Sequence, residues 1–167
     1  MSSPERHLTD AQRLALSGST LLAFTSATAD WRLTDREELS LAGYPAPDLY
    51  DEWCLSAVEE TPFAIEEIHL IRINDIVGVH RAVRRVLPSR DDRIVWLTSS
   101  IRGPVGRGLS PFEHMADPDH RHVLAFRRRL DAWLGVPILR EARYRRPARS
   151  AMPILGKSSE ENQILRR

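Results

Sequence analysis

The sequence predicts an all-α protein, with two small groups of helices followed by a flexible C-terminal tail. Three observations support this prediction. A capping-box pattern, a Thr or Ser followed three residues later by Gln or Glu, occurs at Thr9 with Gln12, Thr34 with Glu37, and Ser110 with Glu113. Residues 64–87 repeat their apolar side chains with a helical period. Signals for strands are weak, because hairpin dipeptides and sustained two-residue alternation are missing.

The composition excludes several classes of protein. Hydrophobic residues make up 42% of the 167 residues and charged residues 28%, as in ordinary globular proteins. No apolar run approaches the roughly 18 residues that cross a bilayer, and the first residues lack the apolar centre of a signal peptide. The single cysteine, Cys54, cannot form an internal disulfide. We therefore expect a cytoplasmic protein that does not contact membranes, with residues 1–8 as a disordered N-terminus.

Local signals define the elements in order. A helix starts after Thr9, and residues 20–31 are expected to form a lead-in helix. The helix after Thr34 should end at Gly43, since glycine is a common residue just beyond a helix end. A short helix follows Ser110, with proline at its first position. Asp117 followed by Pro118 predicts a further start. The last helix, about residues 119–134, has a narrow apolar stripe of Val123, Phe126, Leu130, Trp133 and Leu134.

Residues 64–87 form the most periodic helix. At about 100° per residue, one arc contains Ile65, Ile68, Ile76, Val79, Val83, Val86 and Leu87, and a second stripe contains Leu70, Ile73 and Val77. Two stripes require two packing partners, so the helix is either central to its own bundle or shared with a second subunit. Arg72 lies inside the main arc. It should either extend its guanidinium to solvent or form an interfacial ion pair.

Residues 135–167 differ from the rest of the chain. They contain eight Arg or Lys and three Glu, a net charge of +5, so the other residues sum to −4. The segment is polar and interrupted by proline, which predicts a basic extended tail. Such a tail can contact an acidic cleft, a phosphate-bearing site or nucleic acid.

No pattern of catalytic or metal-ligating residues is present. His120 and His122 are two residues apart on a helix and point in different directions, so with His114 they are better read as helix-start and surface histidines. Capping accounts for Ser110 without a nucleophilic role. The glycine-rich segment 103–108 lacks the Lys-Ser/Thr of a phosphate loop. We expect no enzyme, no catalytic residue, no metal and no cofactor.

Residues 17–56 resemble an Xre-type helix-turn-helix, which we assign to a domain of residues 9–60. Residues 33–44 (LTDREELSLAGY) match the first helix and turn, and residues 47–53 (PDLYDEW) the recognition helix. Leu33, Leu39, Ala42, Leu49 and Trp53 would close its core. The recognition helix offers Asp48, Asp51 and Glu52 where DNA readers carry basic or amide side chains. The helix-turn-helix is therefore degenerate, and DNA binding through this helix should be weak.

Residues 64–134 resemble the toxin-binding domain of the Xre/MbcA/ParS-type antitoxins. The resemblance rests on residues 76–83 (IVGVHRAV), 94–97 (IVWL), 109–115 (LSPFEHM) and 128–132 (RRLDA), in the family's order. It implies a type II antitoxin that binds a RES-domain toxin, an enzyme that consumes NAD or transfers ADP-ribose from it. It also implies a homodimer within a hetero-oligomer of toxin and antitoxin.

The residues expected to bind the toxin follow from this resemblance and from the charge of the tail. They are Arg107, Ser110, Arg128, Arg129, Arg143, Tyr144, Arg145 and Arg146. The tail is expected to reach the toxin's active site. Two alternatives stay open: a dimeric helix-turn-helix transcriptional regulator without a toxin, and an adaptor for a different protein.

Overall fold

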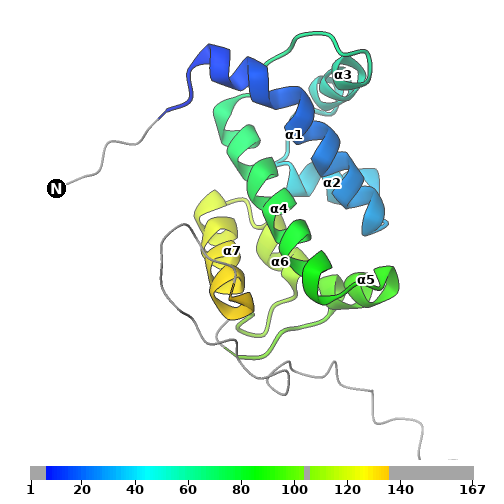
Figure 1. The fold of residues 1–167 in the computed structure, drawn as a ribbon, viewed down its shortest axis with the longest axis vertical. Coiled ribbons are helices and arrows are strands. Elements are labelled where there is room, and N and C mark those ends of the chain that lie inside the picture. Colours follow the sequence, from blue (N-terminus) through cyan, green and yellow to red (C-terminus); the bar gives the residue numbers. More distant parts are fainter. Residues whose placement is uncertain (1–6, 104–105, 136–167) are drawn as a thin grey trace, which may run out of the picture.

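The computed structural model describes residues 7–103 and 106–135, which form seven α-helices and no strand. The all-α prediction is confirmed for these residues. The helices are α1 (Asp10–Asp30), α2 (Asp35–Leu41), α3 (Pro47–Val58), α4 (Glu67–Val86), α5 (Arg90–Thr98), α6 (Pro111–Ala116) and α7 (His120–Leu134). Helix α4 runs through the middle of the molecule, with α1 packed on one side and α7 on the other (Figure 1). Helix α3 packs on α1, and α6 on α7.

The three predicted capping boxes are all present, so local sequence sets these helix starts. At α2, for example, the Thr34 amide donates to the Glu37 carboxylate at 2.8 Å, and the Glu37 amide donates to Thr34 Oγ1 at 3.4 Å. The pairs Thr9 with Gln12 and Ser110 with Glu113 do the same for α1 and α6. The chain leaves α2 through Gly43, whose φ of +89° is the left-handed conformation expected of it.

Two predicted helix starts were wrong. Residues 20–31 are no separate lead-in helix, because α1 continues unbroken from Asp10 to Asp30. Asp117 does not cap α7, since it lies at the end of α6, and the Asp119 carboxylate accepts the Arg121 amide at 2.9 Å instead. Residue 8 was expected to belong to a disordered N-terminus, but it is bound to α4: the Leu8 amide donates to Glu67 Oε1 at 2.7 Å.

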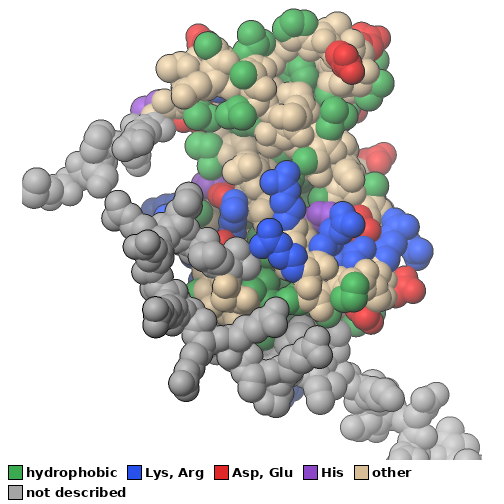
Figure 2. Space-filling model, in the orientation of Figure 1, with side chains coloured by type: hydrophobic (Ala, Val, Ile, Leu, Met, Phe, Trp, Pro, Cys, Tyr) green, Lys and Arg blue, Asp and Glu red, His purple; other side chains and the backbone are tan. Residues whose placement is uncertain are grey.

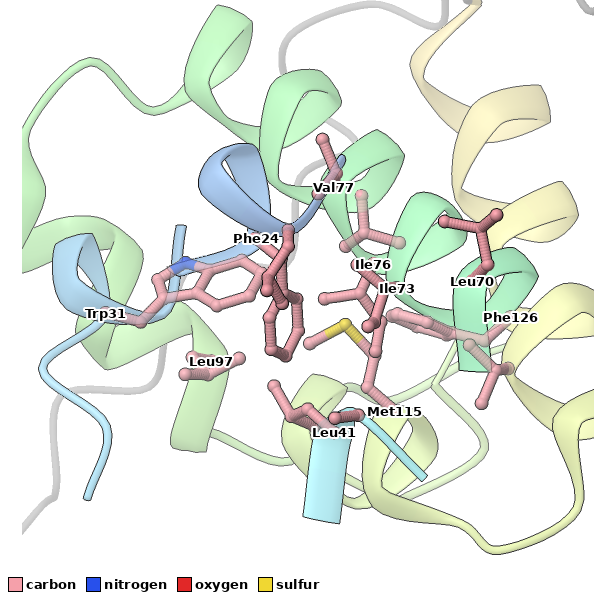
Figure 3. Close-up of a cluster of buried hydrophobic side chains, with 14 of the residues drawn as sticks. Phe24, Trp31, Leu41, Leu70, Ile73, Ile76, Val77, Leu97, Met115 and Phe126 are labelled. Carbon is pink, nitrogen blue, oxygen red and sulfur yellow. The ribbon is translucent and has the colours of Figure 1, made fainter. Parts of the chain in front are cut away.

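One hydrophobic cluster runs through the described part of the chain. Figure 3 shows side chains of α1, α2, α4, α5, α6 and α7 converging around Ile73 and Ile76 of α4. The central position predicted for α4 is thereby explained, because its two apolar stripes face α1 and α7. The boundary predicted between residues 60 and 64 falls in the connection from α3 to α4, and residues on both sides of it belong to the same cluster.

Three apolar residues expected in the interior are exposed. Ile68 is 63% exposed, because it lies on the first turn of α4, beyond the part that α7 covers. Val86, in the last turn, is 37% exposed. Leu49 is 36% exposed, since α3 turns Tyr50, Trp53 and Ala57 inward and leaves its neighbour outside.

Arg72 has neither of the two environments predicted for it. It is only 2% exposed, and its guanidinium donates to backbone carbonyls rather than to a carboxylate. Arg72 Nε lies 2.8 Å from the Leu41 carbonyl at the end of α2, and Nη2 lies 2.6 Å from the Met115 carbonyl in α6. Burial lowers the pKa of Arg72, yet arginine keeps its charge. The partial negative charge of two helix C-termini stabilises that charge.

Candidate partner-binding site

The loop between α5 and α6 is held closed at its base by the backbone. The Ile101 amide donates to the Leu109 carbonyl at 3.0 Å, and the Gly108 amide donates to the Ile101 carbonyl at 2.9 Å. The Arg107 amide donates to the Gly103 carbonyl at 2.9 Å. These bonds make residues 106–109 a compact projection whose side chains, apart from the buried Gly106, face solvent. We refer to residues 106–109 as the arginine loop.

Gly106 fixes the arginine loop to the helices behind it. A Cβ atom at this position would lie 2.2 Å from the Cβ atom of Ile101 and 2.3 Å from its carbonyl oxygen, so only glycine fits. The Gly106 carbonyl accepts a hydrogen bond from His114 Nε2 at 2.7 Å. The His114 ring stacks on Phe126 of α7, with centroids 4.7 Å apart and planes at 8°. The loop is therefore anchored to both α6 and α7.

Two of the predicted toxin-binding residues meet at this loop. Arg107 is exposed at the tip, and Arg129 is half-buried on the adjoining side of α7. Partial burial, and after it the nearby charge of Arg107, lower the pKa of Arg129, which places the two guanidinium groups near each other. Arg107 also has a φ of +52°, a left-handed conformation that non-glycine residues seldom adopt. Arg32, Tyr44 and Glu60 share this conformation, so it is not confined to the site.

The other predicted residues lie elsewhere. Ser110 is 5% exposed, and its hydroxyl accepts the Glu113 amide at 3.2 Å, so it positions the loop without offering its side chain to a partner. Arg128 is exposed, but it is turned about 100° around α7 from Arg129. Arg143, Tyr144, Arg145 and Arg146 lie outside the described residues, as does the tail expected to reach the toxin.

Two features of the site escaped the sequence-based prediction. Leu109 is 44% exposed in the arginine loop, two residues from Arg107, and gives the site an apolar component. His114, expected at the surface, is 7% exposed and serves as the anchor of the arginine loop. A single sequence gives no signal for either, because both depend on how the loop folds back on α7.

A buried ionic cluster attaches α7 to α4. Asp75 is 7% exposed, and its Oδ1 atom lies 2.6 Å from Arg127 Nη1. His120 Nε2 lies 3.3 Å from Asp75 Oδ2, and Arg127 Nε lies 3.6 Å from Asp131 Oδ2. Burial raises the pKa of Asp131. This cluster holds in place the helix that carries Arg129.

Within residues 7–103 and 106–135, no three His, Cys, Asp or Glu side chains are grouped so that they could hold a metal ion. His122, for example, pairs with Asp117 at 2.7 Å, away from His114. In the same part of the chain, no helix combines the length and apolar character that a membrane span requires.

Helix α3, the expected recognition helix, keeps its acidic character in three dimensions. Asp48, Asp51 and Glu52 are all exposed, and no arginine or lysine occurs on this helix. These carboxylates would repel a phosphate backbone.

Comparison with known proteins gave no match to a family model, to a curated protein or to a solved structure.

Proposed function

We propose that this chain is an antitoxin that binds and neutralises a RES-domain toxin, using the arginine loop and the adjoining side of α7. The observation that carries the proposal is the order of the motifs that resemble the antitoxin family. They fall on α4, α5, the start of α6 and α7. The one long connection among these helices contains the arginine loop.

The chemistry of the arginine loop supports a protein partner. Arg107 and Arg129 place two cations near each other, with Leu109 exposed in the same loop as Arg107, and arginine is enriched among the energetically important residues of protein interfaces. Guanidinium groups bind carboxylates and phosphates through paired hydrogen bonds. The partner surface should therefore carry an acidic group next to an apolar one.

The regulator alternative, a dimeric helix-turn-helix protein without a toxin, is less well supported. Its recognition helix would be α3, which presents Asp48, Asp51 and Glu52 to the solvent. Sequence-specific binding to the chain's own promoter through α3 would revive this alternative.

The test is co-expression of the full chain with the product of the neighbouring gene, with growth rescue and co-purification as readouts. The variants are Arg107→Gly and Arg129→Gln. The matched control is Arg36→Gln on α2, because Arg36 is exposed and lies far from the arginine loop in the sequence. We expect each site variant to weaken binding about tenfold or more, corresponding to about 1.4 kcal/mol, while the control binds normally. Circular dichroism confirms that each variant is folded.

The proposal fails if the wild-type chain neither rescues growth nor co-purifies with the toxin. If binding occurs but both site variants match Arg36→Gln, the toxin is bound elsewhere and the assignment of the arginine loop is wrong. Deleting residues 140–167 in the same assay tests the tail, because full neutralisation without it would assign inhibition to the helical part.

A further inference from the structure

The last two turns of α4 carry an exposed group of arginines on one side of the molecule. Arg81, Arg84 and Arg85 are all exposed, and Arg90 follows them at the start of α5. Figure 2 shows Lys and Arg side chains gathered on the visible face over the second half of α4 and beside α5. We define these four arginines as the basic ridge.

The three α4 arginines form no ion pair and differ in this from Arg90, whose Nε lies 3.9 Å from Asp30 Oδ1, and from two other neighbouring arginines. Arg127 is paired with Asp75, and Arg93 lies 2.9 Å from the carboxylate of Asp30. Across the described part of the chain, no carboxylate oxygen lies within 4.0 Å of the Arg81, Arg84 or Arg85 guanidinium. Arg81 and Arg84 therefore add no ion pair between helices, whereas the charge of Arg85 acts at longer range on the Asp131 carboxylate of α7 and lowers its pKa.

The helix dipole accounts for only part of this cluster. Arg84 and Arg85 lie in the last turn of α4, where a cation is favourable. Arg81 lies more than a turn from the end, so it gains less from the dipole. It is also spaced three and four residues from the other two, and like charges at this spacing disfavour the helix. A cluster that opposes local stability points to a role in binding.

The surroundings of the basic ridge favour phosphate over other anionic partners. The tryptophans beside the ridge are Trp31, whose ring contacts His80, and Trp96 of α5; they are 1% and 7% exposed, so neither offers a ring on which an unpaired base could stack. The α4 residues between the arginines, Ala82 and Val83, are buried and supply no apolar centre of the kind a protein partner requires. Arginine side chains on a helix suit the backbone of a duplex.

We infer that the basic ridge binds the phosphate backbone of duplex nucleic acid without reading its sequence. The distribution of charge would orient this contact. Residues 7–62 contain ten Asp or Glu and three Arg, and the acidic α3 belongs to that half. Helix α3 lies at the opposite end of the molecule from α5, so a duplex on the ridge leaves α3 turned away from it (Figure 1). Asp91 and Asp92, which follow Arg90, mark the acidic edge of the ridge.

The inference is independent of the proposed function, and the full chain tests it directly. Fluorescence anisotropy measures binding to a labelled 24-base-pair DNA of arbitrary sequence between 50 and 200 mM KCl. The variant Arg81→Gln/Arg84→Gln/Arg85→Gln is compared with Arg32→Gln/Arg36→Gln/Arg121→Gln, which removes three exposed arginines outside the ridge. Both variants also keep the basic residues 135–167, so the tail contributes equally to each.

Counterion release sets the expected size of the effect. Losing three phosphate contacts should reduce the slope of log K against log salt concentration by about 2 to 3, and should weaken binding more than tenfold relative to the control variant at 100 mM KCl. Restoring the charge with Arg81→Lys/Arg84→Lys/Arg85→Lys should recover most of the slope, because phosphate contacts of this kind depend mainly on charge.

Three outcomes would overturn the inference. In the first, the ridge variant and the control variant have the same slope of log K against log salt concentration. In the second, a labelled single strand binds as tightly as the duplex. In the third, polyglutamate of matched charge competes as well as duplex DNA, and the ridge is then a surface for an acidic protein. A ridge variant with wild-type circular dichroism and a reduced slope supports it.

Discussion

Replacing Arg72 by methionine should destabilise the whole helical part of the chain. The side chain is 2% exposed, and its two shortest bonds join carbonyls of α2 and α6, at 2.8 Å to Leu41 and 2.6 Å to Met115. Methionine fills much of the same space but donates no hydrogen bond. Both carbonyls then lose their partner in a site that water does not reach.

The magnitude follows from these two bonds. A buried carbonyl without a partner costs about 1–3 kcal/mol, so two cost about 2–6 kcal/mol. Relief of the guanidinium's own desolvation offsets part of this. We expect Arg72→Met to lower the free energy of unfolding by about 3 kcal/mol. Arg72→Lys, with one ammonium on a stem that cannot reach both carbonyls, should lose about 1–2 kcal/mol by the same argument.

Urea denaturation followed by circular dichroism measures both changes. With a slope of about 1–3 kcal/mol per molar urea, the methionine variant should unfold at a concentration at least 1 M lower. Arg36→Met is the control, because an exposed substitution on α2 should stay within about 0.5 kcal/mol of wild type. If Arg72→Met unfolds with the control, or Arg72→Lys is as stable as wild type, then the two carbonyls do not depend on the guanidinium and the reasoning is refuted.

Three further predictions concern single side chains. Arg93, with His80, lowers the pKa of Asp30 from 3.8 to about 2, and the Asp30 side chain is only 22% exposed. The ionised Asp30 should therefore add about 1–2 kcal/mol to the free energy of unfolding above pH 4, and this contribution should be lost as the pH falls toward 2. Urea unfolding of wild type and Asp30→Asn should therefore differ at pH 5 and converge near pH 2; a gap that is constant with pH contradicts this. Gly78→Ala should lower the melting temperature, because its Cβ would lie 2.3 Å from the Arg127 guanidinium carbon and would displace that group from its ion pair with Asp75. Gly18→Ala, with 3.9 Å to its nearest neighbour, should raise it. Arg107→Gly should raise the free energy of unfolding by up to about 1 kcal/mol, because glycine adopts a φ of +52° without strain; a loss of stability would show that the side chain supports the fold.

The helix starts could be predicted because their causes are local. Thr34 and Glu37 are three residues apart, and no distant contact is needed for them to cap α2. The central helix was likewise predictable, since its two apolar stripes are visible in the sequence itself. The exposure of apolar side chains at the ends of helices could not be predicted. Ile68 matches the periodicity of α4, yet whether another helix covers that turn is decided by the fold.

The environment of Arg72 and the pairing in the candidate site depend on tertiary structure. Arg72 contacts carbonyls 31 and 43 residues away in the sequence, and carbonyls occur at every residue, so no side-chain pattern reveals them. Sequence reasoning placed Arg107 and Arg129 in one functional set, but their proximity depends on the loop closing over α7. Ser110 was given the right structural role as a cap, and the fold makes that role the main one because the hydroxyl is buried.

Helix α4 packs on α1 with one face and on α7 with another, and this limits how the chain can be taken apart or recombined. A fragment of residues 64–134 would expose to water the face that α1 now covers, and such a fragment would be prone to aggregate. Grafting residues 64–134 onto another N-terminal half would require a matching apolar surface on the new α1. The packing therefore favours keeping these helices together as one unit.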